Sequence, residues 1–179
     1  MVDSGAKSAC IHPTGSVRRT RWLNAVPLAM DLILWRHADA EDGTPDSERK
    51  LTAKGIKQAA RMAKWLRPRL PGDAVVLASP AKRAQQTARA LTPDFRVVEE
   101  IGTGAAAEEV LRACGWPKGG RTLVVVGHQP TLGEVAAWLL TGTPGQWNLK
   151  KGAVIWITCG AGGGSARPSL RAAIAPDLL

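Results

Sequence analysis

From Met30 onward, short runs of apolar residues alternate with longer segments whose apolar residues recur at helical spacing. The short runs are apolar throughout, which is typical of strands buried on both faces of a sheet. The longer segments are amphipathic, with apolar residues three or four positions apart. We therefore predict strands at 31–35, 74–78, 95–98, 121–126, 153–158 and 170–174, and helices at 53–67, 80–91, 105–113 and 132–140.

This alternation predicts an α/β domain built as a three-layer sandwich, in which helices cover both faces of a mainly parallel central sheet. The chain of 179 residues fits one such domain, which we place at residues 30–179. Residues 1–29 show no periodicity and mix polar, basic, Gly and Pro residues. We expect them to be a disordered leader or an extension from an upstream start site.

Capping residues mark where several of the predicted helices begin and end. Thr52 is placed to cap the first helix, and Ser79 followed by Pro80 fits the N-cap and first position of the second. Thr131 and Glu134 have the spacing of a capping box for the last helix. Gly115 suits the C-terminal end of the third.

The net charge of +9 favours anionic partners but does not choose among them. A nucleic-acid or polyanion binding module is one alternative. We do not expect nucleic acid as the partner, because no nucleic-acid-binding motif is present and the Trp residues are not interleaved with Lys and Arg.

The chain has three cysteines, an odd number, and no CxxC pair, so we expect neither a disulfide framework nor a zinc site. This cysteine content fits the reducing environment of the cytoplasm. The chain also lacks an apolar run long enough to span a membrane, so we expect no membrane association.

Polar residues suited to catalysis or ligand binding follow three of the predicted strands. Arg36 and His37 follow the first strand, Ser79 follows the second with Arg83 in the next helix, and His128 follows the fourth. Ligands of open α/β sheets bind beyond the carboxyl ends of the strands, so these side chains are expected to meet at one edge. The sequence therefore predicts a positively charged pocket that contains a histidine.

That combination suits phosphoryl transfer. Neutral imidazole is nucleophilic near pH 7, so His37 can attack phosphorus and become a phosphohistidine. Arg36 and Arg83 can hold the phosphoryl oxygens with bidentate guanidinium groups, and a protonated His128 would add a third donor. The chemistry requires neither a cofactor nor a metal, and no metal-ligand spacing is present in the sequence.

Three motifs together resemble the histidine phosphatase superfamily, and among its members the short SixA-type phosphohistidine phosphatases. The resemblance covers about residues 30–160 and implies a phosphoglycerate mutase-like fold. It also implies that His37 is the nucleophile and that Arg36, Arg83 and His128 form the phosphate pocket. Ser79 is a further candidate phosphate contact, because the helix N-terminus that follows it suits phosphate. The motifs are Leu34-Trp35-Arg36-His37-Ala38, Ser79-Pro80 with Arg83-Ala84 and Gln86-Thr87-Ala88, and Val126-Gly127-His128-Gln129-Pro130, supported by Asp-x-x-Arg and Leu-Thr between Asp46 and Thr52.

The resemblance supplies no general acid. Glu100, Asp39 and Glu41 are the candidates, and water or His128 are alternatives. The stretch 92–120, where larger family members carry an insertion, is short here. A short insertion leaves the site open, which suits a phosphorylated protein side chain better than an enclosed metabolite. We therefore expect a metal-independent phosphatase acting on protein phosphohistidine, with a phosphatase or mutase for small phosphate esters as the alternative.

Overall fold

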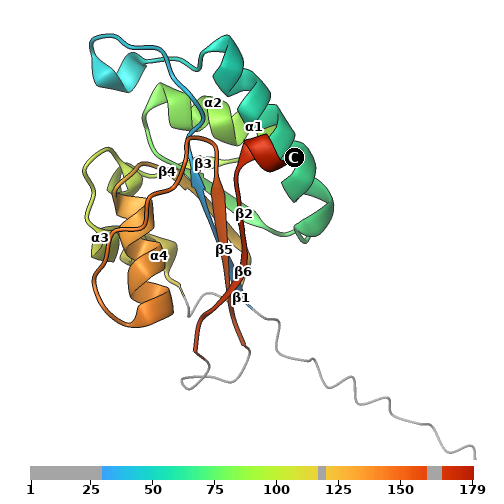
Figure 1. The fold of residues 1–179 in the computed structure, drawn as a ribbon, viewed down its shortest axis with the longest axis vertical. Coiled ribbons are helices and arrows are strands. Elements are labelled where there is room, and N and C mark those ends of the chain that lie inside the picture. The colour runs from blue at the N-terminus through green and yellow to red at the C-terminus, as the bar shows by residue number, and fades with distance from the viewer. Residues whose placement is uncertain (1–29, 117–119, 161–166) are drawn as a thin grey trace, which may run out of the picture.

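A computed structural model describes residues 30–116, 120–160 and 167–179 (Figure 1). The expected leader at 1–29 lies outside the described residues. The strands of the described chain are β1 (Met30–Arg36), β2 (Val75–Ala78), β3 (Arg96–Val97), β4 (Leu123–Gly127), β5 (Val154–Cys159) and β6 (Ser169–Ile174). The helices are α1 (Ala53–Leu66), α2 (Lys82–Leu91), α3 (Ala107–Cys114) and α4 (Thr131–Thr141), with short 3-10 turns η1 (Asp46–Glu48), η2 (Arg67–Arg69), η3 (Glu99–Ile101) and η4 (Pro176–Leu178).

The described strands form a single sheet in the order β3-β2-β4-β1-β5-β6. β3, β2, β4 and β1 pair in parallel, whereas β5 pairs antiparallel with β1, and β6 antiparallel with β5. The mainly parallel sheet predicted from the apolar runs is therefore confirmed, with an antiparallel edge added to it. In consequence, the carboxyl ends of β1, β2 and β4 lie next to one another.

Helices cover both faces of this sheet, as the alternation predicts. Figure 1 shows α3 and α4 on one side and α1 and α2 on the other. Successive residues of β1 enter different cores: Ile33 and Trp35 pack on the side of α1 and α2, whereas Leu32 and Leu34 pack on the side of α3 and α4. Asp31 to Trp35 are thus buried on one face of the sheet or the other, which explains the absence of polar alternation. Among the described helices, none is long and apolar enough to cross a membrane.

Two of the predicted caps are wrong, and tertiary hydrogen bonds explain both. α2 begins at Lys82 with Ala81 at its N-cap, so Ser79 and Pro80 precede the helix. The Ser79 hydroxyl lies 2.7 Å from Nε2 of His128 and accepts from the Ala81 N–H, which precedes the helix. Thr131 is the first residue of α4, and its hydroxyl donates to the Ala105 carbonyl.

The caps predicted at the other helices are confirmed. The Thr52 hydroxyl accepts from the Gly55 backbone N–H at the start of α1. Gly115 ends α3 in the left-handed conformation, with φ of 59°, which glycine adopts without steric cost.

Candidate active site

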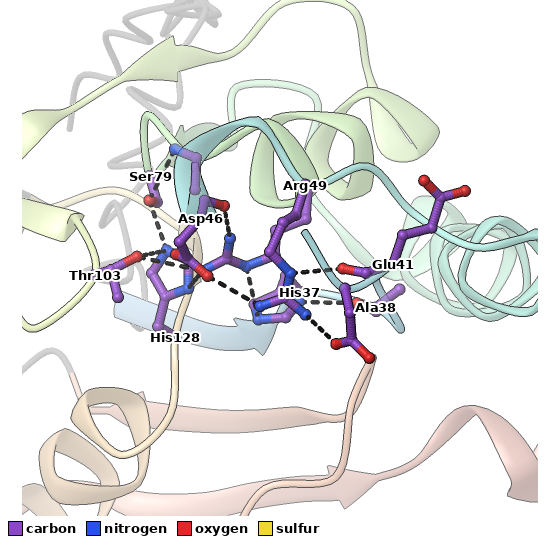
Figure 2. A network of polar contacts seen from close by, with 11 residues as sticks. His37, Ala38, Glu41, Asp46, Arg49, Ser79, Thr103 and His128 are labelled. Carbon is purple, nitrogen blue, oxygen red and sulfur yellow. Dashed lines mark hydrogen bonds and ion pairs between the residues drawn. The ribbon is translucent and has the colours of Figure 1, made fainter. Parts of the chain in front are cut away.

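The backbone ladder between neighbouring strands continues past their ends and fixes the first residues of three loops. The His37 N–H donates to the Gly127 carbonyl at 3.0 Å, and the Ser79 N–H donates to the Val126 carbonyl at 3.0 Å. These bonds place His37, Ser79 and His128 along one edge of the sheet. The rings of His37 and His128 have centroids 5.2 Å apart (Figure 2).

Arg83 connects the two histidines from the first turn of α2. Its side chain is almost completely buried, with 3% of the residue exposed. Its Nε donates to Nε2 of His37 at 3.3 Å, and its Nη2 lies 3.4 Å from Nδ1 of His128. The structure therefore brings together three of the four predicted catalytic residues, His37, Arg83 and His128, with the guanidinium in contact with both imidazoles.

Hydrogen bonding determines which nitrogen of His37 is available for reaction. Its Nδ1 lies 2.8 Å from the Ala38 carbonyl, which only accepts, so Nδ1 carries the ring proton. Nε2 then keeps its lone pair and accepts from Arg83. The pKa of His37 is lowered from the ordinary 6.5 to about 4, mainly by burial. The hydrogen bond to Ala38 opposes this shift, and the charge of Arg83 adds to it. At neutral pH the ring is uncharged, as a nucleophile requires.

His128 occupies a similarly dry environment. Its pKa is lowered from 6.5 to about 3, mainly by burial and then by the neighbouring charges of His37 and Arg83. Its Nε2 lies 2.7 Å from the Ser79 hydroxyl and 3.4 Å from that of Thr103. The ring is therefore neutral at pH 7, and the third positive donor expected from the sequence requires an anion beside it, because a nearby anion stabilises the imidazolium.

We expect the His37 ring to titrate well below 6.5, towards about 4. Its pKa is lower in the folded chain than in the unfolded chain, so the associated stability is present above pH 6.5 and is lost as the pH falls towards 4. Ring ¹⁵N shifts followed by NMR over this range, assigned by comparison with His37→Ala, measure the midpoint. Far-ultraviolet circular dichroism at each pH verifies that the chain is folded. A midpoint near 6.5 in folded protein contradicts the buried, neutral site.

Arg36 lies beside the histidines without a hydrogen bond to either ring. Its Nη1 donates to the Leu149 carbonyl at 2.5 Å, and within the described residues its buried Nε has no hydrogen-bond partner. Its charge nevertheless contributes to the lowered pKa values of both His37 and His128. The guanidinium lines a cavity of about 390 Å³, to which Asp39 and Lys151 also contribute.

The three candidate acids differ in their position. Asp39 receives hydrogen bonds from Lys151 at 2.5 Å and from Thr52 at 2.9 Å, and the bond from Lys151 is the main cause of its lowered pKa, so it is ionised at neutral pH. The Glu41 carboxylate points away from His37 (Figure 2). Glu100 lines a cavity of about 490 Å³ together with Thr103, whose hydroxyl approaches His128.

Asp46 and Thr103 were not predicted as site residues. Asp46 accepts from Arg83 through its carboxylate at 2.8 Å and through its backbone carbonyl at 2.6 Å (Figure 2). Hydrogen bonds from Arg49 and Arg83 lower the pKa of the Asp46 carboxyl. The Asp-x-x-Arg spacing of Asp46 and Arg49 was the available signal, but it did not show that Asp46 would bind Arg83. Thr103 carried no signal in the sequence.

Known proteins are similar to this chain in sequence. The model of the histidine phosphatase superfamily (branch 1) matches residues 32–110. An uncharacterized protein of Mycobacterium tuberculosis is 36% identical over 117 residues, 60% of this chain and 72% of that protein. A phosphohistidine phosphatase SixA homolog of Haemophilus influenzae is 30% identical over 126 residues, 62% of this chain and 77% of that protein.

The fold gives the same relationship. The structure of a protein histidine phosphatase SixA complexed with tungstate superposes with a TM-score of 0.71 at 25% identity, covering 83% of this chain and 99% of that one. The family match, the sequence relatives and the fold support phosphatase activity. The chain belongs to the histidine phosphatase superfamily.

Proposed function

We propose that this chain is a metal-independent phosphatase that removes the phosphoryl group from protein phosphohistidine through a covalent intermediate on His37. The observation that carries the proposal is the neutral His37 ring, protonated at Nδ1, with its Nε2 facing a buried arginine. A nucleophile and a fixed cation are thereby directed at the same point. Charge stabilisation of a phosphoryl group requires this arrangement.

The reaction follows in two displacements. Nε2 of His37 attacks phosphorus, the phosphorus–nitrogen bond of the substrate breaks, and the substrate imidazole leaves after taking a proton. Water then attacks phospho-His37, phosphate leaves, and Nε2 regains its lone pair. In both steps the Arg83 guanidinium exchanges its hydrogen bond to Nε2 of His37 for hydrogen bonds to the phosphoryl oxygens. Arg36, which lines the cavity of about 390 Å³, adds positive charge.

The acidic residues around the site support a phosphohistidine substrate over an ester. Asp39 and Asp46 have lowered pKa values and are ionised, so neither is a proton donor at neutral pH. Expulsion of an alkoxide from an ester benefits strongly from a general acid. An imidazole leaving group is a weaker base than an alkoxide and needs less assistance, so water suffices.

Comparison of two peptides of the same sequence, one with phosphohistidine and one with phosphoserine, tests the proposal. We expect kcat/KM to be at least about 100-fold higher for the phosphohistidine peptide, because hydrolysis of the ester lacks the rate acceleration that a general acid provides. Treatment with EDTA is expected to leave turnover unchanged, because arginines supply the positive charge. Equal turnover of both peptides, or an EDTA loss restored by a divalent ion, contradicts the proposal.

Trapping the intermediate locates the nucleophile. Rapid quenching during turnover is expected to leave an acid-labile, base-stable phosphate on the enzyme, and peptide mapping is expected to place it on His37. An acid-stable phosphate on Ser79 would overturn the assignment.

The position of Glu100 favours an ester phosphatase as a second candidate, since it shares a cavity with Thr103 beside His128. In that case Glu100→Gln would lower turnover of the phosphoserine peptide and leave turnover of the phosphohistidine peptide unchanged.

A further inference from the structure

The exposed face of α1 carries a basic stripe, which we define as Lys54, Lys57, Arg61 and Lys64. These four side chains are exposed, and their spacing of three or four residues places them on one side of the helix, opposite the buried Ala59, Met62 and Leu66. α1 contains no Asp or Glu. Within the described residues, the stripe forms no salt bridge.

This arrangement opposes the stability of the helix. Like charges three or four positions apart repel, and each neighbouring pair in the stripe has that spacing. Lys54 also lies in the first turn, where the helix dipole favours an anion. An ordinary solvated face mixes both signs of charge, so a single sign maintained over three turns indicates an anionic partner.

The stripe leads to the catalytic edge. Lys57 and Arg61 line a cavity of about 350 Å³ on the surface of α1. This cavity adjoins the cavity of about 390 Å³ that contains Arg36, because the two share part of their lining. The shared residues are Lys54, Gln58, Pro176 and Asp177. A continuous surface therefore runs from the basic stripe to Arg36. The two carboxylates in its lining, Asp177 and Asp39, are each paired with a lysine.

The length of the stripe indicates the kind of partner. Ten residues of α helix separate Lys54 from Lys64, which corresponds to about 15 Å. A phosphate or a small metabolite is much shorter than that. Three of the four stripe residues are lysines, whose mobile charges suit attraction to a broad acidic surface better than bidentate recognition of one group.

We propose that the basic stripe is a docking surface for an acidic face of the phosphoprotein substrate, next to its phosphohistidine. The inference rests on the proposed function. Docking at α1 would hold the substrate so that its phosphorylated side chain enters by Arg36 and reaches His37. Docking at α1 would strengthen the binding of a protein substrate and would not change the turnover of a small substrate.

The double variant K57E/R61E tests the docking surface. Two substrates are compared: a histidine-phosphorylated domain of net negative charge, and p-nitrophenyl phosphate. We expect kcat/KM for the domain to fall at least about 10-fold, since reversing charges at an interface removes steering and creates repulsion. Turnover of p-nitrophenyl phosphate is expected to stay within about twofold. The fall is expected to shrink as salt is raised.

R112E/R121E is the matched control. It makes the same change in net charge with two exposed residues, one on α3 across the sheet from α1 and one before β4. We expect it to leave both substrates unaffected. Equal losses in the two variants, or no loss in K57E/R61E, would refute the docking surface. If the wild-type enzyme fails to dephosphorylate the domain, the proposed function fails instead, so the two failures are distinguishable.

Discussion

His37→Ala is expected to reduce turnover of a phosphohistidine peptide and of p-nitrophenyl phosphate by at least about 1,000-fold, the scale of removing a catalytic nucleophile. The reason is the geometry at Nε2: it is the unprotonated nitrogen of a neutral ring, and Arg83 donates to it. Within the described residues, His128 is the other imidazole at this edge, and its Nε2 is engaged by Ser79. It is therefore a poor substitute for His37.

Added imidazole makes this test specific to the chemistry. The variant leaves a space beside Arg83 in which free imidazole can act as the nucleophile, so a partial recovery of turnover is expected. The melting temperature of the variant shows whether the chain is folded. Full turnover in the folded variant, without imidazole, would remove His37 from the mechanism.

Arg83→Ala is expected to lower kcat/KM by about 100- to 1,000-fold, as for the loss of one donor that stabilises transition-state charge. Arg83 is buried and touches both imidazoles, so a water molecule is a weak replacement. Arg83→Lys is expected to recover little, because an ammonium lacks the planar fork. Because the charge of Arg83 lowers the pKa of His37, the ring ¹⁵N midpoint is also expected to rise in Arg83→Ala.

Arg89→Ala is the matched control for this prediction. Arg89 is on the same helix but exposed, and it lies over the ring of Phe95. Its loss is expected to leave both kcat/KM and the His37 midpoint unchanged. If Arg83→Ala behaves like Arg89→Ala, the guanidinium is structural and the proposed phosphate pocket is wrong.

The sequence predicts the parts of this molecule that depend on repeated patterns. The continuous apolar runs of β1 and β4 indicate strands buried on both faces, and strand-end positions then place His37 and His128 at a common edge. Parallel pairing makes this inference possible, because it aligns the carboxyl ends of β1, β2 and β4.

The remaining features depend on contacts between residues far apart in the chain. Ser79 has the local pattern of an N-cap, but its hydroxyl approaches His128, 49 residues away. Asp46 is in a loop without periodicity, and it reaches Arg83 across 37 residues. Such bonds are set by how the loops fold onto the sheet, for which hydrophobic spacing contains no information. For the same reason the sequence does not identify the general acid.

The ion pair between Asp46 and Arg83 also has a consequence for product inhibition. Any phosphate that binds beside His37 must take hydrogen bonds of Arg83 away from a carboxylate, so part of its binding energy is offset by the loss of that internal anion. The side chain of Asp46 is half exposed, which allows it to withdraw into solvent when the phosphoryl group arrives. A phosphoprotein that makes the proposed docking contacts can compensate for this cost, whereas free phosphate cannot. We therefore expect weak inhibition by inorganic phosphate, and tighter phosphate binding in Asp46→Asn.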